Sequence, residues 1–284
     1  MAISKSSALM NQYKTFTLAV DAYQNKKMMG RIYHASREAA IPFIGLIDLV
    51  KCLETLFDEM HYPMPSMVQR RFKAVKKTPA MELPPVAPSS DVEVKGELLT
   101  LRLTIKHRYN ASWQGHVQVQ ESGEQFVFAS FLELVRFLDS HLDDKESAFD
   151  GIEESSVCRV AVDEYGSYCM KGHIHQIASE KKFYFCSAIQ IMRYMERMSV
   201  NSVSEKKVVT NQALGIYRDR GKKATFVIRL LFRENATWQG RICWKETSQT
   251  MNFRSFLELL HLMDAALMSL DLWKQDDKDQ KRAQ

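Results

Sequence analysis

The fold is decided by the stretch from Phe226 to Leu267, which reads FVIRLLFRENATWQGRICWKETSQTMNFRSFLELLHLMDAAL. It begins with apolar residues at every second position, passes through the run Asn235 to Gly240, and ends in apolar residues with helical spacing. Alternation is typical of a strand with one buried face, and a period near 3.6 is typical of an amphipathic helix. The same plan occurs four times, so the sequence predicts internal repeats.

One glycine in each copy brings the four copies into register without a gap. An alternating apolar triplet lies before each glycine, an apolar residue follows it two positions later, and a phenylalanine follows it thirteen positions later. This pattern predicts a hairpin around the glycine and a short third strand. The glycines are Gly30, Gly115, Gly172 and Gly240, and the phenylalanines are Phe43, Phe128, Phe185 and Phe253.

A helix is predicted to close each copy. In three copies a serine is followed three residues later by Glu or Gln, which is a capping box: Ser130/Glu133, Ser187/Gln190 and Ser255/Glu258. The first copy has a weaker start, Gly45 and Asp48. We interpret the charged pairs spaced i, i+3 on the outward helix faces as solvated ion pairs without a chemical role. They are Lys51/Glu54, Arg136/Asp139, Arg193/Glu196 and His261/Asp264.

The copies are of two kinds. Type A carries Ala-Val-Asp-x-Tyr at 19–23 and 161–165, and type B carries Arg-x-Asn-Ala-Ser/Thr-Trp-Gln-Gly at 108–115 and 233–240. One three-stranded sheet with one helix buries little apolar surface, so each A is expected to pack on the following B. The sequence therefore predicts an α+β fold of four βββα repeats in the order A-B-A-B. Its antiparallel sheets carry helices on one face, in two pseudo-dimeric halves, 1–150 and 151–284, divided within the polar stretch 143–156.

The composition is that of a globular protein that works in water. Of 284 residues, 45% are hydrophobic and 26% are charged, and the net charge of +5 permits a polyanionic partner without requiring one. Five cysteines without a CxxC pair indicate neither a disulfide framework nor a zinc knuckle. With no signal peptide in the first residues and no long apolar run, we expect a cytoplasmic protein that does not contact a membrane.

No sequence signature of an enzyme is present. The chain has no Gly-rich phosphate loop, no HExxH and no nucleophile elbow, so we expect a non-enzymatic protein without a cofactor. His173 and His175 form an HxH that could bind a metal if a third ligand joined them. Two partly exposed strand histidines are the more ordinary interpretation, and we assign no metal site.

Basic residues collect on the strand face opposite the core. Strand parity places there Arg31, Arg102, Lys106, His116, Arg159, His173, His175, Arg229 and Arg241, together with Tyr33, against the acids Asp21 and Asp163. Cationic groups can pair with phosphates while an aromatic ring stacks on a base, which suits a single-stranded nucleic acid. The alternative is an ordinary polar face that meets solvent or another sheet.

Two connections add further positive charge. The first, 69–77, has five basic residues and no acid around Phe72, and includes Arg70, Arg71 and Lys73 as candidate contacts; the second is 218–223. Charged runs are usually solvated, but their equivalent positions in the two halves suggest a shared use. Trp113 and Trp238 could be stacking platforms or a partner-binding surface, although parity favours a place in the core at the hairpin end.

Each B-type repeat contains a strand, a connection at Asn110–Gly115 or Asn235–Gly240, a next strand and a terminal helix. This order of elements resembles PUR-repeat and Whirly-type folds. Those families bind single-stranded nucleic acid and usually have four strands before the helix, whereas three are predicted here. The resemblance implies binding by a curved basic sheet. The leading hypothesis is thus a protein that holds single-stranded RNA or DNA. The alternative is a protein-interaction scaffold or adaptor that presents exposed Trp and helix surfaces to a protein partner or to a second copy.

Overall fold

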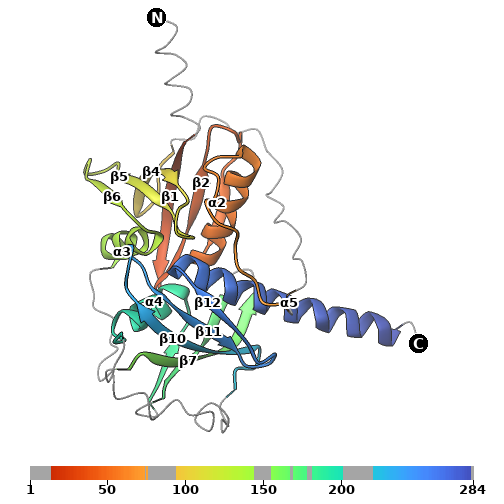
Figure 1. Cartoon of the computed structure of the whole chain (residues 1–284). Helices are drawn as coiled ribbons and strands as arrows, with labels where there is room; N and C mark the ends of the chain where they lie inside the picture. The colour runs from red at the N-terminus through yellow and green to blue at the C-terminus, as the bar shows by residue number, and fades with distance from the viewer. Residues whose placement is uncertain are drawn as a thin grey trace, which may run out of the picture. The chain divides into compact units, whose positions relative to one another are not determined.

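The computed structural model describes residues 14–73, 75, 94–143, 155–166, 169–177, 181–200 and 220–282, with side chains as far as residue 270 except that of Cys169 (Figure 1). The chain forms two compact units. Unit 1 contains residues 1–68 and 80–145, and unit 2 contains 69–79 and 146–284. The predicted change of half at 150/151 and the start of the second basic connection, 218–219, lie outside the described residues.

Unit 1 is one six-stranded antiparallel sheet with two helices. Its elements are β1 (Thr15–Gln24), β2 (Lys27–Tyr33), β3 (Ile41–Ile44), α2 (Leu46–Met60), β4 (Leu99–His107), β5 (Gln114–Val119), β6 (Gln125–Phe128) and α3 (Phe131–Leu142). The strand order is β3-β2-β1-β4-β5-β6. The A and B repeats therefore join where β1 pairs with β4.

Unit 2 repeats this arrangement. Its elements are β7 (Val157–Gly166), β8 (Cys169–Gln176), β9 (Lys182–Phe185), α4 (Ala188–Glu196), β10 (Ala224–Phe232), β11 (Gln239–Trp244), β12 (Gln249–Phe253) and α5 (Phe256–Arg282). The strand order is β12-β11-β10-β7-β8-β9. The prediction of an α+β fold with four βββα repeats in two similar halves is confirmed.

The anchor glycines are required by close packing between neighbouring strands. A Cβ added at Gly115 would lie 1.9 Å from the Thr104 carbonyl oxygen and 3.0 Å from the ring of Phe128. Gly115 and Phe128 are paired across β5 and β6, and the other three copies have the same pairing. The glycine and the phenylalanine thirteen residues later are thus one packing unit, in which the ring occupies the space that a side chain would fill.

The helix starts follow the predicted capping boxes. Ser130 Oγ accepts from the Glu133 amide at 3.1 Å, and the Glu133 carboxylate accepts from the Ala129 amide at 2.7 Å. Ser187 and Ser255 cap α4 and α5 in the same way, whereas α2 begins after Gly45 and uses Asp48 alone. No helix in the described part of the chain is long and apolar enough to cross a membrane.

The B-type motif builds its own hairpin loop. Asn110 and Ala111 both have φ of 53°, the left-handed region, which asparagine tolerates. The Gln114 amide bonds the N–H and the C=O of Tyr109 at 2.9 and 3.0 Å, and Ser112 Oγ accepts from the Phe131 amide at 2.9 Å. Gln239 and Thr237 do the same in the fourth repeat. These motif residues hold the framework together.

Three of the four acids at the outer helix positions join the A and B repeats, so interpreting those three as members of solvated ion pairs was wrong. Trp113 Nε1 and Arg108 of repeat two donate to Glu54 on α2, the indole at 2.7 Å. Tyr23 of repeat one donates to Asp139 on α3, which is 3% exposed. Tyr165 and Asp264 form the same bond in unit 2. The helix pattern shows that these acids lie beside the apolar stripe, but the partner repeat that covers them is set only by the fold.

Candidate nucleic-acid interface

The outer face of the unit 2 sheet carries two neighbouring cross-strand rows without an acid. In one row, Arg229 of β10 lies directly opposite Arg241 of β11, between Val157 and Asn252. In the next row, Lys182, His175 and Arg159 are paired across β9, β8 and β7. Like charges directly opposite each other destabilise a sheet by up to about 1 kcal/mol per pair. The sheet therefore concentrates basic groups at one end of this face.

The basic residues of these rows differ in exposure. Arg241 and Lys182 are exposed and Arg229 is half-buried. The Nε atom of Arg229 is buried and has no hydrogen-bond partner among the described residues. Arg159 is only 1% exposed, so it offers no surface for direct contact.

An exposed aromatic ring lies on β9, two residues after Lys182. Tyr184 on the edge strand β9 is 77% exposed and is paired with His173, whose ring centroid lies 6.3 Å from that of the tyrosine. His173 Nδ1 lies 3.4 Å from Asp163 Oδ2. The sequence interpretation passed over Tyr184. Tyr184 lies twelve residues after the anchor glycine, directly before the phenylalanine that occurs in all four copies. This position was a usable signal for an outward ring.

The corresponding face of unit 1 lacks the arginine pair of unit 2. Where unit 2 has Arg229 and Arg241, the repeat register places Thr104 and His116 in unit 1, and Thr104 bonds Thr15 through their Oγ1 atoms at 3.2 Å. Arg102 and Lys106 are exposed on β4. Burial, and then the charge of Lys106, lower the pKa of His116, so this histidine is neutral near pH 7.

Arg31, the other basic candidate in unit 1, has a structural role. Its guanidinium bonds both Asp21 carboxylate oxygens at 2.8 and 2.9 Å, donates to Tyr33 Oη at 2.6 Å, and reaches the Lys95 carbonyl at 3.0 Å. The hydrogen bond from Arg31 lowers the pKa of the Asp21 carboxyl. Because its donors are already used within the sheet, Arg31 is poorly placed to bind a phosphate.

The first basic connection packs on unit 2. Phe72 is 2% exposed and its ring lies 5.5 Å from that of Trp244. Arg70 Nη1 donates to the Asn252 carbonyl at 2.9 Å, and the Arg70 amide reaches Glu258 at 3.4 Å. Arg71 and Lys73 are exposed. We call residues 69–73 the strap. Lys76 and Lys77 lie outside the described residues.

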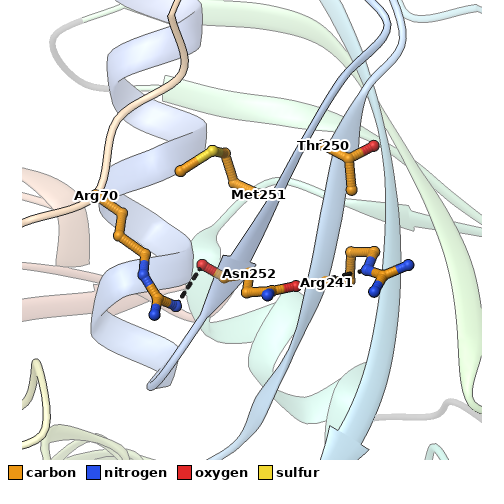
Figure 2. A pocket seen from close by; sticks show the side chains of 5 residues that line it. All are labelled: Arg70, Arg241, Thr250, Met251 and Asn252. Atoms are coloured by element: carbon orange, nitrogen blue, oxygen red, sulfur yellow. Dashed lines mark hydrogen bonds between the residues drawn. The ribbon is translucent and has the colours of Figure 1, made fainter.

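An open pocket of about 390 Å³ lies at the edge strand β12, lined by Arg70, Arg241, Thr250, Met251 and Asn252. Figure 2 shows Asn252 between the two arginines. Its backbone oxygen accepts from Arg70, and its side-chain oxygen lies 3.5 Å from Arg241 Nε. The strap and the basic row therefore meet at one site, although the sequence places them in different halves.

A second B-type signature was missed in the sequence. Gly96 and Gly221 precede β4 and β10, and each donates its amide to a threonine four residues later, Thr100 or Thr225, at 3.1 Å. A Cβ at Gly96 would lie 2.6 Å from Val20 N. Gly96 and Gly221 each lie nineteen residues before an anchor glycine, Gly115 or Gly240. This equal spacing could have revealed the glycine–threonine contact in the sequence.

Two other candidates from the sequence have different outcomes. Trp113 and Trp238 are 0% and 1% exposed, which confirms their place in the core and removes them from any docking surface. Among the described residues, no three His, Cys, Asp or Glu side chains are grouped as a metal site would require.

Comparison of the chain with protein-family models, with curated proteins and with solved structures gave no match. The repeated architecture of sheets and helices agrees with the resemblance to PUR-repeat and Whirly-type folds only at the level of architecture.

Proposed function

We propose that the protein binds single-stranded RNA or DNA without catalysing a reaction, chiefly on the outer face of the unit 2 sheet. The observation that carries this proposal is the direct pairing of Arg229 with Arg241, next to the row Lys182, His175 and Arg159. Two arginines directly opposite each other destabilise the free sheet, and a polyanion would relieve the repulsion between Arg229 and Arg241.

The neighbouring Tyr184 supports a single strand over a duplex. A ring that is 77% exposed beside cationic groups can stack on an unpaired base, and stacking of this kind stabilises binding by about 1–3 kcal/mol per base. The bases of a duplex are already stacked on each other. Arg102 and Lys106, both exposed on β4, offer the same chemistry in unit 1. The architectural resemblance to PUR-repeat and Whirly-type folds points to the same class of ligand.

The test is binding of a fluorescent oligo(dT) or oligo(U) to the full chain by anisotropy, from low to physiological salt. Removing phosphate contacts lowers the salt dependence, since each contact contributes a slope of about 0.7 in log–log form for single strands. Arg229→Gln and Tyr184→Ala should weaken binding. Arg197→Gln, an equal loss of charge at the exposed end of α4, should not. An absence of binding at low salt, or a flat salt dependence, would refute the proposal.

A protein-interaction scaffold remains the second candidate, but Trp113 and Trp238 cannot serve it because they are buried. Exposed apolar side chains on an edge strand favour it, in particular Val127 of β6, which is 77% exposed. A complex insensitive to salt and free of nucleic acid, weakened by Val127→Asp, is the outcome that supports this candidate.

A further inference from the structure

The pocket at β12 brings together two arginines from distant parts of the chain. Arg241 lies on β11 within the basic row, and Arg70 comes from the strap. The side chain of Arg241 makes one long hydrogen bond among the described residues, from Nε to Asn252, so its two terminal nitrogens are available. Arg70 uses Nη1 for the Asn252 carbonyl, and it is 35% exposed.

The pocket also has a suitable electrostatic balance. The nearest acid to Arg70 is Glu258, whose carboxylate lies 3.9 Å from Arg70 Nη1 and is 1% exposed. Glu258 is already paired with Arg254 and accepts the Arg254 amide at 2.7 Å. Because this one buried carboxylate is shared between Arg70 and Arg254, Arg70 and Arg241 leave a net positive charge at the pocket. Thr250 and Asn252, both exposed, add a hydroxyl and an amide as neutral partners.

The strap is held at this place by the shape of unit 2. In unit 1, Phe126 is stacked on Phe137 at 4.9 Å and His141 lies 4.1 Å from Phe137. The repeat register replaces these three residues in unit 2 by Met251, Leu262 and Ala266. The ring of Phe72 is buried against that of Trp244, and the repeat register places Val119 at the position of Trp244 in unit 1. The strap therefore fits unit 2 specifically.

We propose that Arg70 and Arg241 together bind one phosphate group of the nucleic-acid strand, with Phe72 as the positioning residue that anchors the strap. This inference rests on the proposed function, because it identifies where the strand meets β12. The planar guanidinium groups can each donate two hydrogen bonds to phosphate oxygens. The strap thereby completes a site of which the sheet supplies only half.

The test uses the full chain and a fluorescent oligo(dT). Arg70→Gln and Arg241→Gln should each weaken binding about tenfold, the loss expected for a charge-assisted hydrogen bond. Because both side chains bind one phosphate, the double variant should be weakened less than the product of the single effects. The salt slope should fall by about 0.7 in either single variant and fall no further in the double variant.

Phe72 is tested through its neighbours. Phe72→Ala should weaken binding as much as Arg70→Gln, while Phe72→Leu should largely retain it, with far-UV circular dichroism checking the fold of both. Arg71→Gln is the matched control within the strap, since Arg71 is exposed and does not line the pocket. It should weaken binding less than Arg70→Gln.

The outcomes separate the two proposals. Suppose that wild type binds and Arg229→Gln weakens binding, but Arg70→Gln and Phe72→Ala behave like Arg197→Gln. The phosphate site of Arg70 and Arg241 is then refuted, and the proposed nucleic-acid binding stands. Fully additive effects of Arg70→Gln and Arg241→Gln would also refute a shared phosphate. If oligonucleotides do not bind at all, the proposed function fails. In that case inorganic phosphate is the probe. If it raises the melting temperature of wild type and not of the double variant, Arg70 and Arg241 form a site for free phosphate.

Discussion

Tyr23 donates a hydrogen bond of 2.5 Å to Asp139, which lies 116 residues later in the chain. The carboxylate also lies 3.3 Å from Lys26 Nζ, and the side chains of Lys26 and Asp139 are 6% and 4% exposed. Tyr165 and Asp264 repeat the bond in unit 2. The tyrosine of the A-type motif therefore identifies the site where the helix of the B repeat docks, which explains why the motif occurs once in each half.

Removing this bond should destabilise unit 1. Tyr23→Phe is expected to lower the free energy of unfolding by about 1.5–3 kcal/mol, the usual value for a hydrogen bond to a charged group. Asp139→Ala should cost about 3–5 kcal/mol, because Lys26 would stay buried with Asp143 as its remaining acid. Urea unfolding of the full chain measures both. Glu164→Gln, which breaks an exposed pair with Lys171, should cost less than about 1 kcal/mol. Equal costs for Tyr23→Phe and Glu164→Gln would contradict the interpretation.

The anchor glycines should not tolerate alanine. In Gly240→Ala, the new Cβ would lie 2.1 Å from the Arg229 carbonyl oxygen and 2.7 Å from the Phe253 ring. We expect a loss of at least about 3 kcal/mol, at the upper end for overpacking. Adding Phe253→Leu should not rescue it, since the closer atom belongs to the backbone. Gly166→Ala is the control, because no atom lies within 4 Å of its Cβ. Thermal melting of the three variants provides the comparison.

Two cysteine thiols should resist modification in the folded protein. Burial raises the pKa of both Cys52 and Cys158 to about 12, so near pH 8 they carry almost no reactive thiolate. Among the four cysteines whose side chains the structure describes, Cys186 and Cys243 are half-buried and should react first with a thiol reagent. Mass spectrometry of peptides after brief labelling, with and without urea, measures this order. Labelling of Cys158 as rapidly as Cys243 without urea would contradict the burial.

His116 should affect the pH dependence of stability. Its pKa is lowered in the folded protein by burial and then by Lys106, so the unfolded chain takes up this proton first as the pH falls below about 6.5. Stability is therefore lost on acidification, and His116→Gln should reduce the fall in melting temperature between pH 7.5 and 5.5. At pH 7.5 the same variant should bind oligonucleotides as wild type does, because His116 is then uncharged. A loss of binding at pH 7.5 would show that it acts as a cation.

The strap should become accessible to protease when its anchor is removed. Arg71 and Lys73 flank the buried Phe72, and trypsin requires a locally opened backbone on the carboxyl side of these residues. Phe72→Ala should increase the rate of cleavage at 71 and 73 relative to wild type, as followed by mass spectrometry. Cleavage at an unchanged rate would show that the ring does not hold the strap.

Several parts of the candidate site could be predicted from sequence, and others could not. Strand parity correctly identified the outer positions of Arg229 and Arg241, because alternation is local. It could not show that Arg159 is buried, that Arg31 is used by Asp21, or how far Tyr184 is exposed, since these depend on what covers each face. The pairing of Arg229 with Arg241, which unit 1 lacks, also escaped notice, because it becomes visible only when residues are arranged in cross-strand rows.

The sequence by itself determined the four βββα repeats, their A-B-A-B order and their helix starts. Alternation, the glycine and phenylalanine spacing and the capping boxes act within one repeat, so they can be read from a short stretch such as Phe226 to Leu267. Only the tertiary structure decided that Glu54 and Asp139 join repeats, and that the strap packs against Trp244 and brings Arg70 beside Arg241. Those contacts link residues far apart in the chain, and their partners are chosen by side-chain shape and burial, which no local pattern contains.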